Sequence, residues 1–294
     1  MVWLIVGGLI LLMLVYSYFN TFRMVLREVE HTIPHKSGFG PLRILQLSDL
    51  HMERQSISPQ RLRNLALATK PDLIVLTGDY LDRYHNIEKC VEYLKRVVTV
   101  NPKYGTYVVF GNHDHYLGER ICELQAALEK IGCRVLCNES ETIETEGAPL
   151  TVIGIDDHCL GKSDIPKSYQ NVPSEGIHLV LAHDPNTILA MNESHPADYI
   201  LSGHFHGGQF NLIPYLHRVM GFGELPKHDI LKGMHRVNGK TIYISEGLGQ
   251  SGLNVRLRSR PEITLHTLRT GRPDVAPAAA KTSETFAPAL DGGY

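Results

Sequence analysis

Five short apolar runs in the sequence are each followed by residues that bind divalent metal ions. Carboxylate, amide and imidazole side chains suit hard or borderline ions, and these motifs contain no cysteine. Such residues could hold two cations about 3.5 to 4 Å apart, a pair that clamps the attacking and leaving oxygens of a phosphoryl transfer. In chain order, residues 44–47 lead to Asp49 and His51, 73–76 to Asp79, 107–110 to Asn112, His113 and Asp114, 179–181 to His183, and 199–201 to His204 and His206.

A sheet must position these runs if their polar residues are to meet. Continuous Val, Ile and Leu runs between amphipathic segments are typical of buried strands in an α/β sheet. Sites in such sheets form beyond the carboxyl ends of the strands, so the sequence predicts one cluster. Helices are expected to begin at Ser58-Pro59 and to lie around Leu94 and Leu128, and further strands at 134–136, 150–155, 241–244 and 263–266.

Each motif alone also has a purely structural explanation. An aspartate after a strand is commonly a turn or helix-capping residue, so Asp49 or Asp79 alone favours a structural role. His183 alone does so too. His204 and His206 at alternate positions favour metal binding, and the Gly-Asn-His-Asp motif at 111–114 favours it more. The complete set, in this order, predicts a metal site.

The five motifs, in this order, resemble the calcineurin-like metallophosphoesterase family over roughly residues 43 to 268. The resemblance implies an α/β fold, a four-layer α/β/β/α sandwich of two mixed sheets. It also implies two divalent ions, with manganese expected and iron or zinc as alternatives. One ion would be held by Asp49, His51, Asp79 and His206, and the other by Asp79, Asn112, His183 and His204, so Asp79 would bridge them.

The resemblance also implies a role for the residues that follow Asn112. His113 would face the leaving group and could donate a proton to the departing oxygen. Asp114, which comes next in the sequence, could fix the tautomer of His113. We therefore expect a hydrolase that cleaves a phosphoester.

Composition excludes some partners and compartments. The chain has 294 residues, of which 43% are apolar, and a net charge of −2, which allows a sizeable core and argues against a nucleic-acid surface. Its five cysteines are an odd number at irregular spacing. They indicate free thiols in a reducing compartment, although Cys133 and Cys137 could instead be half of a metal site.

The amino-terminal residues predict a membrane anchor. Residues 2–22 carry no charge and have aromatic residues at both ends, as a single membrane-spanning helix does. A cleaved signal peptide is the alternative, but a basic leading segment and a small-residue cleavage site are missing. We predict an anchor at 1–22, a linker at 23–42, the catalytic domain at 43–269 and a disordered tail at 270–294. Basic residues after the anchor, Arg23, Arg27, Lys36 and Arg43, place the domain in the cytoplasm by the positive-inside rule.

Two basic segments are candidates for binding the substrate. The loop at 215–236 mixes Arg218 with Val219, Met220 and Phe222, and is either a solvated insertion or a lip that rests on the membrane. The alternating Arg256, Arg258 and Arg260 could lie on a strand and bind phosphate.

The anchor and the segments around 203–209 and 247–262 resemble a membrane-anchored subgroup that includes phosphohydrolases of the LpxG and YkuE type. The resemblance implies a lipid-linked substrate such as UDP-2,3-diacylglucosamine, used in lipid A biosynthesis. Phe205 replaces the threonine usual in that subgroup. A general phosphodiesterase or phosphatase of the cell envelope and a non-enzymatic scaffold with this fold are the alternatives, and the intact His113 and ligand set argue against the scaffold.

Overall fold

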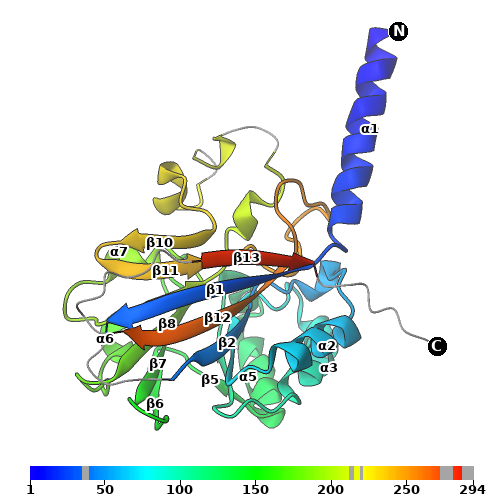
Figure 1. Cartoon of the computed structure of the whole chain (residues 1–294). Coiled ribbons are helices and arrows are strands. Elements are labelled where there is room, and N and C mark those ends of the chain that lie inside the picture. Colours follow the sequence, from blue (N-terminus) through cyan, green and yellow to red (C-terminus); the bar gives the residue numbers. More distant parts are fainter. Residues whose placement is uncertain (35–39, 212–214, 219–220, 272–280, 287–294) are drawn as a thin grey trace.

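The structure is a computed structural model that describes residues 1–34, 40–211, 215–218, 221–271 and 281–286 (Figure 1). Two mixed sheets form its centre, as predicted. The first has the strand order β13-β1-β12-β2-β3-β4-β5, with β1 at Val25–Pro34, β2 at Leu42–Leu47, β3 at Leu73–Thr77, β4 at Thr106–Val109, β5 at Cys133–Val135, β12 at Glu262–Gly271 and β13 at Lys281–Phe286. The second has the order β10-β11-β9-β8-β7-β6, with β6 at Glu139–Ile143, β7 at Leu150–Ile155, β8 at Ile177–Ala182, β9 at Tyr199–Ser202, β10 at Gly233–Val237 and β11 at Lys240–Ile244.

Alternate side chains of each strand enter different layers of the core. In β3, Leu73 and Val75 join the core between the two sheets, which also holds Leu179 and Leu181 from β8. Ile74 and Leu76 point to the opposite face of the first sheet. Because side chains alternate along a strand, a continuous apolar run is buried on both faces.

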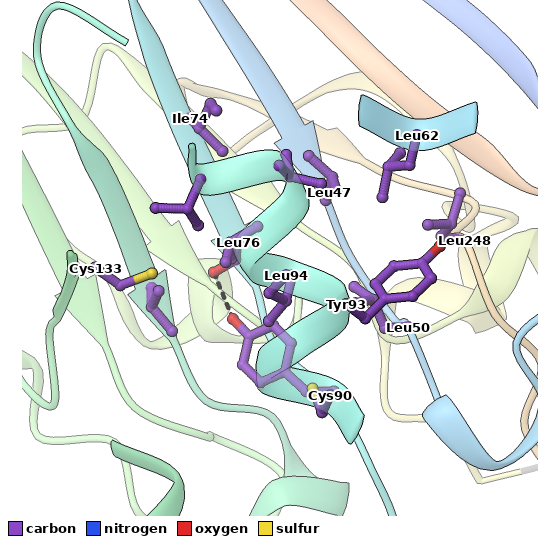
Figure 2. Packing of buried hydrophobic residues seen from close by; sticks show 14 of the residues in the cluster. Leu47, Leu50, Leu62, Ile74, Leu76, Cys90, Tyr93, Leu94, Cys133 and Leu248 are labelled. Atoms are coloured by element: carbon purple, nitrogen blue, oxygen red, sulfur yellow. Dashed lines mark hydrogen bonds between the residues drawn. The ribbon is translucent and has the colours of Figure 1, made fainter. Parts of the chain in front are cut away.

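Helices cover the outer face of the first sheet. The three predicted helices are α2 at Pro59–Thr69, α3 at Ile87–Val98 and α5 at Ile121–Lys130. Ser58 caps α2 by accepting a hydrogen bond from the Arg61 N–H. In Figure 2, Cys90, Tyr93 and Leu94 of α3 pack with side chains from β2 and β3.

The outer face of the second sheet is covered by shorter elements. Its core unites Ile153, Val180 and Ile242 from the strands with Ile165 and Ile188. Ile165 lies on α6 (Ile165–Ser168) and Ile188 on α7 (Thr187–Ala190). The layers are therefore helix, sheet, sheet and helix, in agreement with the predicted sandwich.

The amino-terminal helix α1, Val2–Asn20, projects from the domain (Figure 1). It is long and apolar enough to cross a membrane. Its last turn is fixed to the domain, where Ser17, Asn20 and Thr21 are buried. The Ser17 carbonyl accepts a hydrogen bond from the Arg256 N–H at 2.9 Å, and Ser56 Oγ donates to Thr21 Oγ1 at 2.9 Å.

Two predicted boundaries were wrong. The segment 23–42 is not simply a linker, because β1 pairs with β12 in parallel from Val25–Glu262 to Pro34–Gly271. The tail from residue 270 is not wholly disordered, because β12 extends to Gly271 and β13 pairs with β1. Residues 35–39, 272–280 and 287–294, parts of the predicted linker and tail, lie outside the described residues.

Candidate metal centre

The carboxyl ends of five strands converge, as the sequence predicts. β2, β3 and β4 are parallel neighbours in the first sheet, and β8 and β9 are parallel neighbours in the second. The loops after these strands carry all seven predicted ligands. Potential ligand atoms from six of them gather in groups within 4.8 Å of one another.

The first group consists of Asp49, His51 and His206. His206 Nε2 lies 3.1 Å from His51 Nε2 and 3.4 Å from Asp49 Oδ1. Burial, and after it the neighbouring His51 and Arg256 side chains, keep the pKa of His206 well below its usual value. His206 therefore remains neutral, which a metal-binding imidazole requires.

The second group consists of Asp79, His183 and His204. His183 Nε2 lies 3.2 Å from Asp79 Oδ2 and 3.3 Å from His204 Nδ1. The carbonyl of Thr77 accepts a hydrogen bond from His183 Nδ1 at 2.7 Å, which leaves Nε2 available for an ion. Asp79 Oδ2 also lies 3.6 Å from His51 Nε2, so Asp79 stands between the two groups.

Unpaired buried oxygens show that the site fits two cations. Within the described part of the chain, Asp49 Oδ2 and Asn112 Oδ1 are buried and have no hydrogen-bond partner. A buried oxygen without a partner costs about 1 to 3 kcal/mol, and a cation would remove that cost. Asn112 belongs to the predicted second set, and its Nδ2 donates to the Tyr116 hydroxyl at 3.4 Å.

The backbone is strained where the ligands lie. Five of the seven predicted ligands have a positive φ, with Asp49 at 53°, His51 at 42°, Asp79 at 58°, His204 at 75° and His206 at 51°. Such a conformation costs a residue other than glycine roughly 1 kcal/mol or more. Strain concentrated in this way is typical of a functional site, where the backbone must aim several side chains at one point.

Asp114 does not have the role that we predicted. One carboxylate oxygen accepts hydrogen bonds from the N–H groups of Asp79 and Gly111, at 2.8 and 2.9 Å, and the other accepts from Tyr80 N–H at 2.8 Å. Asp114 therefore fixes the loop that carries Asp79. Its position at the start of the short helix α4, Asn112–His115, directs its carboxylate to backbone donors.

Asp82 is the carboxylate that contacts the His113 ring, and sequence reasoning missed it. Asp82 Oδ1 lies 2.8 Å from His113 Nδ1 and 3.1 Å from His51 Nδ1. Burial lowers the pKa of His113, but the hydrogen bond to Asp82 and the charge of Asp79 raise it, and the net pKa lies above the usual value. The His113 ring is 22% exposed and its Nε2 is 4.0 Å from Asp79 Oδ2. The contact with Asp82 therefore favours the protonated form of His113, whose ring lies beside the ligand cluster.

Arg256 is a structural residue, so its predicted role in binding substrate was wrong. It is completely buried, which lowers its pKa to about 10. Its guanidinium donates to the carbonyls of Glu246, Gly247 and Gly249. It also lies 3.5 Å from the His206 carbonyl and 3.4 Å from His206 Nδ1. The backbone N–H of Arg256 donates to the Ser17 carbonyl, so Arg256 joins the end of α1 to the loop that carries the predicted ligand His206.

We expect Arg256→Lys to lower both stability and activity. A lysine ammonium cannot reach all the carbonyls that the planar guanidinium joins, and buried carbonyls would lose their partners. The expected destabilisation is about 3 kcal/mol, measured by chemical unfolding of the full-length protein. Arg258→Lys is the matched control, because Arg258 is exposed. Equal stability of both variants would contradict the role given to Arg256.

The other two predicted substrate residues lie on the surface, and Arg258 is not on the expected strand. Arg258 is exposed, has a φ of 61° and is not on a strand. Arg218 is exposed and forms an ion pair with Asp229. Val219 and Met220 of the predicted lip lie outside the described residues, whereas Phe222 is described and 38% exposed.

A large cavity of about 1050 Å³ opens beside the ligand cluster. Its polar end includes Asp79, Asn112, His113, His204 and His206. Its remaining wall is largely apolar and includes Phe205, Leu189, Phe210, Phe222, Leu231, Leu253 and Val255. Phe205, which stands where the related subgroup has threonine, is 5% exposed and belongs to the core of the second sheet. The cavity therefore combines a polar reaction centre with an apolar surface.

All five cysteines are unpaired, as the sequence predicts. Burial raises the pKa of both Cys133 and Cys137 to about 12. Neither belongs to a candidate metal group among the described residues. The alternative of a metal half-site at these two cysteines is thus not supported.

Comparison with known proteins is consistent with this geometry. A family profile described as calcineurin-like phosphoesterase matches residues 42–208, a range that contains all seven predicted ligands. The metallophosphoesterase YkoQ of Bacillus subtilis is 48% identical over 77% of this chain and 83% of its own length. The phosphodiesterase YaeI of Escherichia coli is 33% identical over 78% of this chain and 83% of its own length. A Danio rerio protein named transmembrane protein with metallophosphoesterase domain is 29% identical over 76% of this chain and 52% of its own length.

Proposed function

Because the chain belongs to the calcineurin-like phosphoesterase family and is a metal-dependent phosphoester hydrolase, we propose that it cleaves a lipid-linked substrate at the membrane. The bond cleaved is a phosphodiester or a pyrophosphate, and UDP-2,3-diacylglucosamine is one substrate of this class. The observation that carries the proposal is the cavity that joins the ligand cluster to an apolar wall. An acyl chain would bury that wall while its phosphate lies at the cluster.

We propose a distinct role for each group that surrounds the phosphate. Two divalent ions, for which the mixed carboxylate, amide and imidazole set suits manganese, would polarise the phosphoryl group and activate water when bound. Asp79 would contact both ions, since it stands between the two groups. His113, whose protonated form is favoured by the contact with Asp82, would donate its proton to the departing oxygen.

The position of the cavity also suits a lipid. Its lining includes His217, which lies in the short turn η5 at Leu216–Arg218, and Phe222 and Glu224, which shortly precede the turn η6 at Leu225–His228. It also includes Ser251, Leu253 and Val255 from the loop before β12. In Figure 1 these yellow and orange segments lie on the side of the domain from which α1 projects. A membrane crossed by α1 would thus lie on that side.

We expect Phe222→Ser and Leu253→Ser, made together in the full-length protein, to reduce hydrolysis selectively. Leu253 is 73% exposed and lines the cavity with Phe222, so both can contact an acyl chain. Turnover of a lipid phosphodiester in vesicles should fall about tenfold or more, whereas turnover of bis-p-nitrophenyl phosphate should change little. Leu67→Ser is the control, because Leu67 is 42% exposed on α2 and does not line the cavity. Equal effects on both substrates would favour a general cell-envelope phosphodiesterase.

We also propose a single-pass topology with the catalytic domain in the cytoplasm. Its support is the excess of arginine directly after α1, at Arg23, Arg27 and Arg43. Cys122 and Cys159 are exposed and can report the topology. A membrane-impermeant maleimide should leave both unmodified in intact cells and modify them after the membrane is permeabilised. Modification of intact cells would place the domain on the outer side.

A further inference from the structure

A second cavity, of about 680 Å³, lies where α1 joins the domain. Tyr16 and Asn20 of α1 form one part of its lining, and β1 contributes Val25 and Arg27. None of its lining residues lines the cavity beside the ligand cluster. It is therefore a separate site at the base of the helix that rises from the domain in Figure 1.

The charge of this cavity is positive. Its lining contains four basic residues, Arg27, Lys232, Arg258 and Arg260, and a single acidic residue, Glu246. Arg27 Nη2 and Lys232 Nζ both contact Glu246, at 3.1 and 3.0 Å, so the single Glu246 carboxylate forms ion pairs with two cations. Arg27 also contacts Glu262, at 2.8 Å, and the described lining of the cavity holds four basic residues and one acidic residue. The site has a surplus of positive charge that suits an anion.

The location of the cavity selects the source of the anion. Residues 2–22 carry no charge, and the first charged residue after Met1 is Arg23. The end of α1 therefore lies at the level of the lipid headgroups when the helix spans a bilayer. Tyr16 suits this level, because tyrosine side chains concentrate at membrane interfaces. The contacts of Ser17, Asn20 and Thr21 with the domain fix the cavity at that depth.

We propose that this basic cavity binds the phosphate of an anionic membrane lipid. The inference rests on the proposed membrane anchoring but not on hydrolysis of a lipid, because the cavity is separate from the ligand cluster. Lys232 and Arg258 are the accessible cations, since the Lys232 side chain is 42% exposed and Arg258 is exposed. The bound headgroup would hold the domain against the bilayer at a fixed orientation.

The test measures lipid binding by full-length protein in a neutral detergent, followed by native mass spectrometry. The probes are phosphatidylglycerol, phosphatidylcholine and inorganic phosphate. The double variant Lys232→Gln and Arg258→Gln should bind phosphatidylglycerol about thirtyfold more weakly than the wild type, the expected cost of losing two interfacial cations. The single variant Arg258→Gln, at an exposed residue, should bind phosphatidylglycerol about fivefold more weakly. It replaces the double variant in the test if the double variant folds poorly.

The matched control is Lys95→Gln with Arg96→Gln, which removes two exposed cations from α3. It should retain wild-type affinity for phosphatidylglycerol. Unchanged binding in the Lys232 and Arg258 variants would overturn the proposal. An equal loss of affinity for inorganic phosphate would also overturn it, because the cavity would then be a site for free phosphate. Since turnover is not measured, a failure of the proposed enzymatic function would not alter these outcomes.

Discussion

Asp79→Asn is expected to lower turnover of any phosphoester by about 10³-fold, because Asp79 lies between both ligand groups. Asparagine keeps the shape of aspartate and can keep Oδ1 as the acceptor for His113 N–H, a bond of 2.9 Å in the wild type. The loss would therefore reflect the missing charge and not a collapsed loop. The measurement is turnover of bis-p-nitrophenyl phosphate together with the metal content of the purified protein.

Asp164→Asn is the matched control for this change. Asp164 caps α6 by accepting a hydrogen bond from Lys167 N–H at 3.0 Å, and asparagine caps a helix equally well. Its metal content and turnover should match those of the wild type. An Asp79→Asn variant that retains two ions per chain and a near-native rate would refute the bridging role of Asp79.

His113→Gln should have an effect that depends on the leaving group. If His113 protonates the departing oxygen, esters of poorly acidic alcohols should lose about 10² to 10³-fold in rate, whereas p-nitrophenyl esters should lose far less. Metal content should not change. His115→Gln is the control, because His115 also pairs with a carboxylate, Asp156, at 2.7 Å but does not line the cavity. Equal losses for all leaving groups would show that His113 positions the substrate or stabilises charge instead.

Asp82→Asn tests the same proton transfer through pH. Asp82 raises the pKa of His113, so His113 stays protonated to a higher pH in the wild type. A donor loses its function as the pH rises through its pKa, and the variant should lose activity at a lower pH. The pH profile should be measured with a poorly acidic leaving group. Since Asp82 also contacts His51, metal content must be measured alongside.

The fold and the clustering of the candidate ligands could be predicted because their signals are local. Each ligand follows an apolar run within a few residues, and the runs are buried on both sheet faces, as their continuous hydrophobicity indicates. The carboxyl ends of parallel strands meet by geometry, so the order of the motifs was sufficient to predict one cluster. The three amphipathic helices could be predicted as well, because the spacing of their apolar residues is also a local signal.

The roles of Asp82, Asp114 and Arg256 depend on contacts that sequence order does not encode. Asp114 follows His113 directly but binds backbone donors, whereas Asp82, far away in sequence, reaches the His113 ring. Arginine is seldom buried, so alternation at 256–260 suggested an exposed strand. Only the folded chain brings several carbonyls and the end of α1 around Arg256.

Strand β1 has a consequence for how the protein is made. It is synthesised directly after α1, yet its partners in the first sheet are β12 and β13, near the end of the chain. At ordinary rates of translation these partners appear roughly ten to fifty seconds later. During that interval α1 can enter the bilayer, while the backbone N–H and C=O groups of β1 have no strand partner. Glu28 and Glu30 are exposed on this strand, and such charges discourage an open strand edge from pairing with other nascent chains before the ribosome delivers its partners.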